Sequence, residues 1–93
     1  MNREEARAAV MECLQRREIG GPENLIIIDS STIEKPYGWI FSYNSRRYLE
    51  TGDIRYMVLG GGPIVVIAAT GEIIELGSHP SSIKRMEERR HLL

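Results

Sequence analysis

Residues 38–76 contain the pattern that most limits how this chain can fold. Trp39, Phe41 and Tyr43 alternate with Ile, Ser and Asn, and this alternation is typical of a β-strand that presents three aromatic side chains on one face of a sheet. The run 64–69 is apolar at every position, which predicts a central strand with both faces covered. The chain therefore contains a sheet with a large apolar content.

The flanking segments predict a helix at each end of the chain. Asn2 can cap a first helix with an apolar stripe, and Gly20-Gly21-Pro22 ends it. Ser81 or Ser82 can cap a last helix that reaches about Leu92. The stripe of the first helix consists of Ala6, Val10, Cys13 and Leu14.

Short turns separate the strands expected between the two helices. Strands are expected over 25–33, 37–44, 64–69 and 72–76, and 54–59 is either a short edge strand or an extended loop after the turn at Thr51-Gly52-Asp53. Because the connections are short, the sheet should be antiparallel. We predict one α+β domain over 1–93: an antiparallel four- to five-stranded sheet flanked by an N-terminal and a C-terminal helix, in the order α-β-β-β-β-α. Both helices should cover one face and leave the other partly open.

Charge and cysteine content restrict the functional classes. The net charge is −1, so bulk electrostatics favour neither nucleic acid nor a membrane as partner. Residues 19–82 carry seven acids and four bases, or −3, which would suit a basic protein partner by charge complementarity. Cys13 is the single cysteine, which excludes an internal disulfide and suits a reducing compartment. No apolar run approaches the ~20 residues that span a bilayer. We expect a cytoplasmic protein.

The glycine run before residue 64 has two interpretations. Glycine-rich segments cradle phosphate when they lead into a helix, but Gly60, Gly61 and Gly62 lead through Pro63 into a strand, and no Lys-Ser or Lys-Thr follows. We therefore expect a structural turn or bulge in which at least one of these glycines has positive φ. Gly71, after Thr70, should form a tight turn of the same structural kind.

The aromatic face also has two interpretations. Trp39, Phe41 and Tyr43 either belong to the core or form a stacking platform for single-stranded nucleic acid. A platform needs cations on the same face, whereas Arg46 falls on the opposite one, so the core is favoured. The basic residues of the last helix alternate with Glu87 and Glu88, as on an ordinary solvated helix face.

No residues with the spacing of a catalytic or metal site stand out. Cys13 lies on an apolar stripe, and neither His79 nor His91 has a partner at metal-ligand spacing. Glu72 and Glu75 fall on opposite faces of one strand, so they do not form an acid/base pair. We expect no cofactor, no metal and no catalysis.

Several motifs together resemble one known family. The blocks GWIFSYNSRRYLETGD, LGGGPIVV and TGEIIELG, within residues 5–85, resemble the immunity protein 35 (YrhB-like) family of bacterial polymorphic-toxin systems. Gly61 stands where the family often has Asn, and Ile83 where it often has Tyr. The resemblance implies a protein that binds and neutralises a cognate toxin without catalysis.

The segment between the two predicted hairpins is the candidate binding surface. Loops held by a rigid scaffold often carry binding residues, and Tyr and Arg are frequent at hot spots. The candidates are Arg46, Arg47, Tyr48, Glu50 and Asp53. Alternatively, Tyr48 and Leu49 enter the core and the charges are only solvated. The partner is a toxin or, in a second hypothesis, an unfolded client held on an apolar face by a chaperone-like protein. We expect a monomer or weak homodimer.

Overall fold

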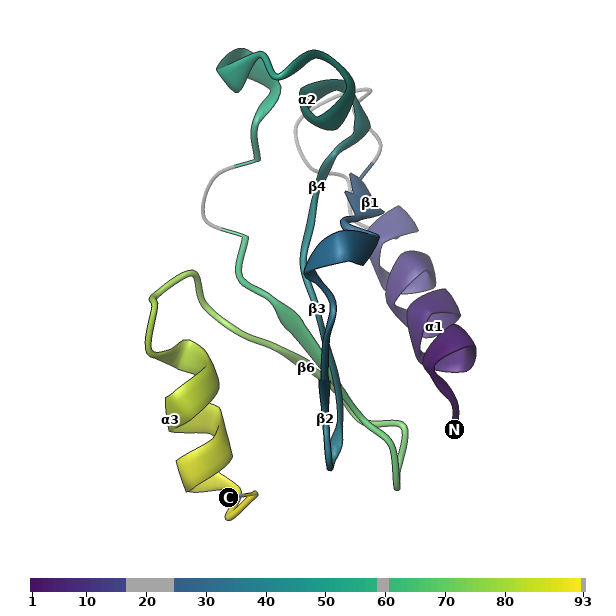
Figure 1. Ribbon diagram of the computed structural model, residues 1–93, viewed down its shortest axis with the longest axis vertical. Helices are drawn as coiled ribbons and strands as arrows, with labels where there is room; N and C mark the ends of the chain where they lie inside the picture. The colour runs from purple at the N-terminus through teal and green to yellow at the C-terminus, as the bar shows by residue number, and fades with distance from the viewer. Residues whose placement is uncertain (17–24, 59–60, 93) are drawn as a thin grey trace.

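The computed structural model describes residues 1–16, 25–58 and 61–92 of the chain. The molecule is elongated, 38 × 26 × 22 Å, with helices on both sides of a twisted set of strands (Figure 1). The elements are, in chain order, α1 (Arg3–Gln15), β1 (Leu25–Ile27), the 3-10 helix η1 (Asp29–Ser31), β2 (Ile33–Lys35), β3 (Gly38–Phe41), β4 (Tyr43–Ser45), α2 (Arg46–Thr51), the 3-10 helix η2 (Ile54–Tyr56), β5 (Ile64–Ile67), β6 (Ile73–Glu75) and α3 (Ser82–Arg89).

All strand pairs in the described residues are antiparallel. Four strands form one sheet in the order β2-β3-β5-β6, and β1 pairs with β4 in a separate two-stranded sheet. The predicted α+β class with terminal helices is therefore confirmed. The expected central strand is also confirmed, because β5 lies between β3 and β6 and is buried along most of its length.

The predicted strand 25–33 is broken in the middle. β1 and β2 pair with β4 and β3 as two parts of one long hairpin, with Ile27 opposite Tyr43 and Ile33 opposite Ile40. The residues of η1, between β1 and β2, take no part in the pairing of these strands with β3 and β4. Its first residue, Asp29, is a polar residue of the kind that favours turns, and its carboxylate accepts hydrogen bonds of 2.7 and 3.1 Å from Arg7 on α1. This ion pair lowers the pKa of Asp29.

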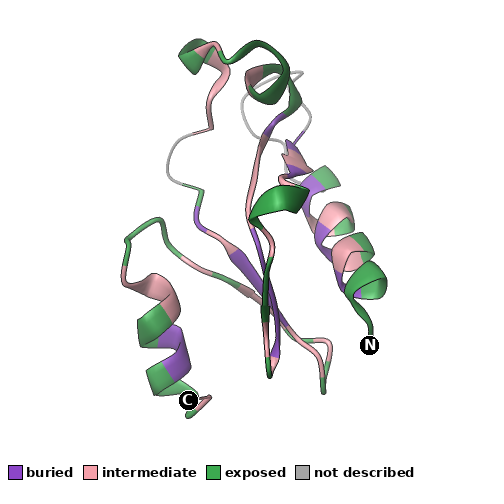
Figure 2. Ribbon diagram, in the orientation of Figure 1, coloured by how far each residue is buried: buried purple, intermediate pink, exposed green. Residues whose placement is uncertain are grey.

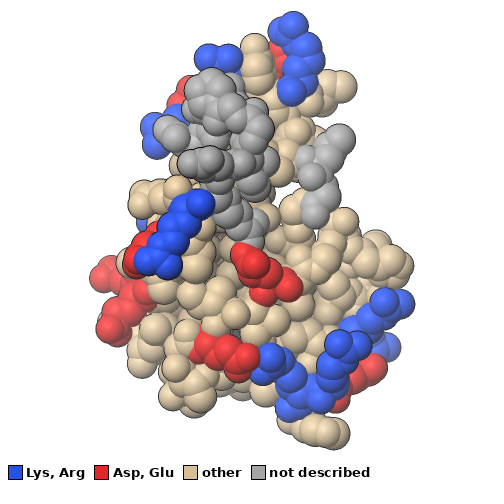
Figure 3. Space-filling model, turned by 180° about the vertical axis from the view of Figure 1, so that it is seen from behind, with Lys and Arg blue, Asp and Glu red and all other residues tan. Residues whose placement is uncertain are grey.

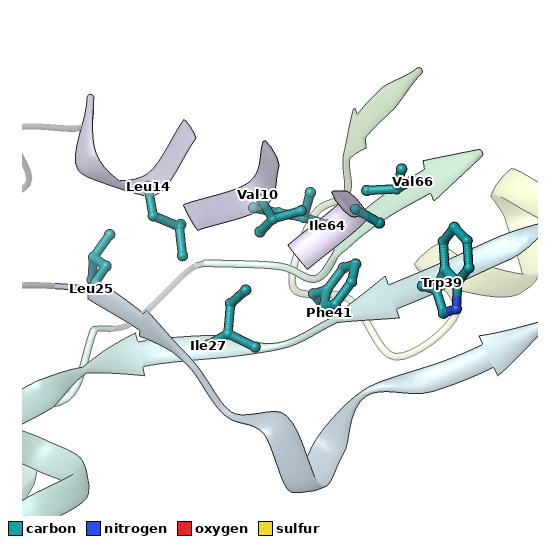
Figure 4. Close-up of a cluster of buried hydrophobic side chains, with 9 residues drawn as sticks. Val10, Leu14, Leu25, Ile27, Trp39, Phe41, Ile64 and Val66 are labelled. Carbon is teal, nitrogen blue, oxygen red and sulfur yellow. The ribbon is translucent and has the colours of Figure 1, made fainter. Parts of the chain in front are cut away.

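The main core lies between α1 and the aromatic face of the strands (Figure 4). Asn2 caps α1 through a reciprocal pair of hydrogen bonds with Glu5, so the helix starts as predicted. The predicted end of the helix, at Gly20-Gly21-Pro22, lies outside the described residues. Trp39 is 7% exposed, which confirms the predicted burial, and Cys13 is half-buried. The buried members of this cluster are Ala6, Val10, Leu14, Leu25, Ile27, Trp39, Phe41, Ile64 and Val66, with Tyr43 packed against them.

The expectation that both helices cover one face is wrong. α1 and α3 lie on opposite sides of the strands (Figure 1), and purple buried positions occur on both helices in Figure 2. The physical reason lies in β3 and β5, which are apolar at successive positions and therefore need cover on both faces. Ile40 and Val65 point away from α1 and pack with Met86 of α3.

Among the glycines before β5, the predicted positive φ is absent at the two positions that the structure describes. Gly61 and Gly62 do not have positive φ, and Gly60 lies outside the described residues. Gly62 instead permits a close backbone approach, because a Cβ there would lie 2.0 Å from the carbonyl oxygen of Leu76. At Gly61 a Cβ would lie 2.7 Å from the hydroxyl of Tyr43. Pro63, half-buried, accepts a hydrogen bond from the Leu76 amide.

The turn at Gly71 follows the sequence prediction, whereas the last helix differs from it. Gly71 has φ of 75° in the turn between β5 and β6, and its amide donates to Ile67. α3 ends at Arg89, before the expected Leu92, and the Ser81 hydroxyl contacts His79 Nδ1 at 2.8 Å instead of capping the helix. Within the described residues, every helix is too short or too polar to cross a membrane.

Candidate partner-binding surface

The segment after β4 forms a helix that sequence reasoning missed. Ser45 caps α2 by accepting a hydrogen bond of 3.1 Å from the Tyr48 amide. Gly52 ends the helix in the left-handed conformation, with φ of 71°, and its amide donates to the Tyr48 carbonyl. The six residues of α2 are too few to display an apolar period, so only the two caps marked the helix in the sequence.

A second short helix, η2, follows immediately. Asp53 caps η2 by accepting a hydrogen bond of 3.0 Å from the Arg55 amide. The same carboxylate binds the guanidinium of Arg55, with Nη2 2.6 Å from Oδ2. The side-chain hydrogen bond from Arg55 lowers the pKa of Asp53. Residues 54–56 are therefore helical, and neither the edge strand nor the extended loop is present there.

Side chains of β4 hold this helical segment in place. The hydroxyl of Ser45, which is completely buried, donates a hydrogen bond of 2.5 Å to the Tyr56 carbonyl. Asn44 Oδ1 accepts hydrogen bonds from the amides of Ser45, at 2.8 Å, and Val58, at 2.9 Å. The α2–η2 surface, defined as the exposed and half-buried residues 46–56, is thus fixed to β4 by polar contacts of the buried Ser45 and the half-buried Asn44.

An aromatic ring with two guanidinium groups near it belongs to this surface. The Arg47 guanidinium carbon lies 4.7 Å from the centroid of the Tyr56 ring, and that of Arg55 lies 5.7 Å from it. Leu49 is 38% exposed and Ile54 is 76% exposed. The surface therefore combines apolar side chains, an aromatic ring and charges at one end of the long axis (Figure 1).

The sequence-predicted binding residues share this end of the molecule. Arg46, Arg47 and Glu50 are exposed on α2, whereas Tyr48 and Asp53 are half-buried. Leu49 belongs to neither core cluster, so the alternative in which it enters the core is wrong.

The charge of the surface differs from that of the surrounding sequence. Arg46, Arg47 and Arg55 outnumber Glu50 and Asp53, so residues 46–56 carry +1 although residues 19–82 carry −3. Lys and Arg side chains are visible at this end in Figure 3, and a second group lies at the opposite end, over α3. A simple match between an acidic surface and a basic partner is therefore not supported here.

Sequence reasoning missed Ile54, Arg55 and Tyr56. The sequence pattern over 54–59 predicted a short edge strand or an extended loop, whereas residues 54–56 form η2 and belong to the α2–η2 surface. The signal that was present is the spacing of Asp53 and Arg55, because a capping carboxylate two residues before an arginine can bind both the amide and the guanidinium of that arginine.

Comparison with known proteins identifies the family. The family model described as "Immunity protein 35" matches residues 4–89. The chain belongs to the immunity protein 35 family. A curated relative, "Uncharacterized protein YrhB" of Escherichia coli (strain K12), is 39% identical over 41 residues, which is 44% of each chain. The chain thus spans less than half the length of this relative. No solved structure matches.

The residues considered for metal binding or thiol catalysis in this member of the immunity protein 35 family lie on separate elements where the structure describes them. Within residues 1–16, 25–58 and 61–92, His, Cys, Asp and Glu side chains form no group of three or more that could hold a metal ion. Cys13 is half-buried on α1, and His79 lies before α3 beside Ser81. The immunity family name points to a protein partner.

Proposed function

We propose that this protein neutralises a cognate bacterial toxin by binding it through the α2–η2 surface, without catalysis. The observation that carries the proposal is the contact of the Arg47 and Arg55 guanidinium groups with the Tyr56 ring, on a surface that also exposes Ile54, in a chain of the immunity protein 35 family. Tyr and Arg are the residue types enriched at binding hot spots. The toxin would be a protein, and no cofactor, nucleic acid or membrane takes part.

The rigidity of the surface favours tight binding. Ser45 and Asn44 fix the backbone at Tyr56 and Val58, so little conformational entropy is lost when a partner docks. The apolar Leu49 and Ile54 can be buried at the centre of an interface, while Arg46 and Glu50 form its polar rim. The mixed charge suits a toxin surface that offers carboxylates to the arginines.

The chaperone-like alternative requires a surface that the described residues do not provide. It needs an exposed apolar sheet face, but α1 covers one face of the sheet and α3 contacts the other through Met86. The exposed Ile33 lies on β2, on a different element from the exposed Leu49 of α2 and Ile54 of η2. We therefore favour a one-to-one complex with one toxin. A cytoplasmic location and a monomeric or weakly dimeric state are part of the proposal.

The test compares two exposed isoleucines. Ile54→Asp and Tyr56→Ala should each weaken binding to the toxin domain encoded in the neighbouring reading frame by about 30-fold or more, since hot-spot truncations cost about 2 kcal/mol. Ile33→Asp on β2, with the same charge change, is the matched control and should bind within about threefold of the parent. Calorimetric titration gives the affinity, and co-expression gives protection of growth.

Two results would contradict the proposal. Full affinity and full protection by a folded Ile54→Asp/Tyr56→Ala double variant would remove the α2–η2 surface as the binding site. Equal losses in the Ile33→Asp control and in Ile54→Asp would show that the effect is not specific to this surface. Thermal unfolding of every variant separates lost binding from lost folding.

A further inference from the structure

A groove between β6 and α3 lies at the end of the molecule opposite the α2–η2 surface (Figure 1). Its volume is about 380 Å³. Ile74 and Leu76 from the strand side and Met86 from the helix contribute its apolar lining. Arg85, Arg89 and Arg90 line it from the C-terminal helix. The groove therefore combines aliphatic surface with guanidinium groups on one side.

The arginines of the groove differ in how they are paired. Arg90 binds Glu72 through two hydrogen bonds of 2.8 and 2.9 Å, and this bonding lowers the pKa of Glu72. Arg85 and Arg89 have no ion-pair partner among the described residues. Both are exposed, and they are four residues apart on one helix face. The sequence pattern suggested an ordinary solvated face, but Glu87, one of its two carboxylates, is buried and accepts a hydrogen bond from Tyr37 instead.

We propose that this groove binds an extended, acidic segment of a partner protein, with carboxylates at alternate positions contacting Arg85 and Arg89. Side chains at positions i and i+4 of a helix lie ~5–6 Å apart, and alternate side chains of an extended strand lie ~6.5–7 Å apart, so the two spacings match within the reach of an arginine. Guanidinium groups bind carboxylates in a bidentate manner. The aliphatic lining can pack against the methylene groups of the bound side chains.

The composition of the groove favours an acidic peptide over a nucleic acid. Single-stranded nucleic acid is held by aromatic stacking platforms, whereas the side chains lining this groove are aliphatic, charged or small, apart from His79. Glu75 also lines the groove and would repel a continuous row of phosphates. In an extended segment with a carboxylate at every second position, the negative charges lie only beside the arginines. This inference does not depend on the toxin-binding role of the α2–η2 surface.

The experiment uses a defined probe. The peptide acetyl-Glu-Leu-Glu-Leu-Glu-amide, carrying a fluorophore, is titrated with the full chain in low salt, and binding is followed by fluorescence anisotropy and by amide chemical shifts in the NMR spectrum. The shifts should concentrate at residues 74–79 and 85–90. Arg85→Ala/Arg89→Ala should weaken binding at least tenfold. Lys84→Ala/Arg3→Ala, which removes the same charge outside the groove, should stay within about twofold of the parent.

Three competing ligands test whether the groove recognises separated carboxylates. Binding of the Gln-Leu-Gln-Leu-Gln peptide as tight as that of the acidic peptide would overturn the proposal, because carboxylates would then be dispensable. Equal or tighter binding of a twelve-nucleotide oligo-dT, displacing the peptide, would also overturn it in favour of nucleic acid. Saturation of the same resonances by inorganic phosphate at the same concentration would overturn it by reducing the groove to a general anion site. Tyr56→Ala should bind the peptide normally, which separates this proposal from the toxin-binding one.

Discussion

The phenol hydroxyl of Tyr37 donates a hydrogen bond of 2.8 Å to the carboxylate of Glu87, fifty positions later in the chain. Lys35 Nζ lies 3.3 Å from the same carboxylate oxygen. Glu87 is only 5% exposed, so this carboxylate is a buried charge with partners from β2 and from the turn before β3. These contacts join α3 to the end of the hairpin formed by β2 and β3. The apolar contacts of the helix there consist of Met86 and a few half-buried neighbours.

Removal of the Tyr37 hydroxyl should destabilise the fold. Tyr37→Phe leaves the buried carboxylate with Lys35 as its remaining partner, and hydrogen bonds to charged groups are worth about 1.5–3 kcal/mol. We expect a loss of that order in the free energy of unfolding, measured by urea denaturation. Glu88→Gln, on the exposed neighbour of Glu87, serves as the control and should change stability by less than about 0.5 kcal/mol. An unchanged Tyr37→Phe variant would show that the bond contributes nothing.

Tyr37 should also make stability depend on alkaline pH. Burial, and then the hydrogen bond and the negative charge of Glu87, raise the pKa of Tyr37 well above its usual value of 10.0. The unfolded chain then loses this proton at lower pH than the folded chain, so stability present below about pH 10 falls as the pH rises further. Tyr37→Phe should show a shallower decline between pH 10 and 11.5 in denaturation experiments. Parallel declines in both proteins would exclude Tyr37 as the cause.

Gly62 and Gly77 provide a matched pair of substitutions. The Cβ of Gly62→Ala would meet the backbone of Leu76 and Gly77 at 2.0–2.4 Å, whereas a Cβ at Gly77 meets nothing within 4 Å. We expect Gly62→Ala to lower the free energy of unfolding by about 1–3 kcal/mol or more, because backbone atoms must move. Gly77→Ala should be neutral or stabilising by a few tenths to about 1 kcal/mol. Equal thermal midpoints for the two variants would contradict the close approach.

Trp39 should dominate the stability of the main core. Trp39→Ala removes the largest side chain of the cluster and should cost about 3–5 kcal/mol. Ile54→Ala, at a 76% exposed position, should cost less than about 0.5 kcal/mol. Because the chain has a single tryptophan, its fluorescence reports this site directly, and the native emission should be shifted to short wavelength. A melting temperature of Trp39→Ala within two degrees or so of the parent would instead favour the aromatic-platform interpretation.

Asn44 should control the local stability of the segment after η2. Asn44→Ala removes the acceptor of the Val58 amide. A net loss of about 1–1.5 kcal/mol corresponds to a roughly tenfold larger equilibrium constant for local opening. Hydrogen exchange at Val58 should accelerate by that factor. Val66, in the centre of β5, provides the reference amide, and its exchange should change only by the global loss of stability. Equal acceleration at both amides would show that Asn44 stabilises the whole fold and not this segment.

Sequence reasoning identified the elements whose signals are local and strong. Asn2 with Glu5 marked the start of α1, and the apolar run 64–69 marked the central strand. It missed α2 because a six-residue helix between Ser45 and Gly52 has caps but no visible period. The break at Asp29 depends on Arg7, which is distant in sequence and close only after folding.

Only part of the α2–η2 surface was predicted, because the sequence shows local composition but not contacts between residues that are distant along the chain. The residues from Arg46 to Asp53 stood out by composition, and they do lie together at one end of the fold. Arg47 and Tyr56 come together because Asn44 and Ser45 fasten the later segment to β4. The buried hydroxyl of Ser45 and the amide oxygen of the half-buried Asn44 leave no periodic signal in a sequence. The groove beside α3 likewise requires the packing of two elements that are separate along the chain.

The α2–η2 surface and the α3 groove lie at opposite ends of a 38 Å axis (Figure 1). On the two proposals above, a protein bound at one end would leave the other end open to solvent, so a single copy would bridge two different molecules. Bridging of this kind has a characteristic dose dependence. The amount of three-component assembly rises until the bridging chain is comparable in concentration with its partners, and it falls when an excess of the chain binds each partner separately.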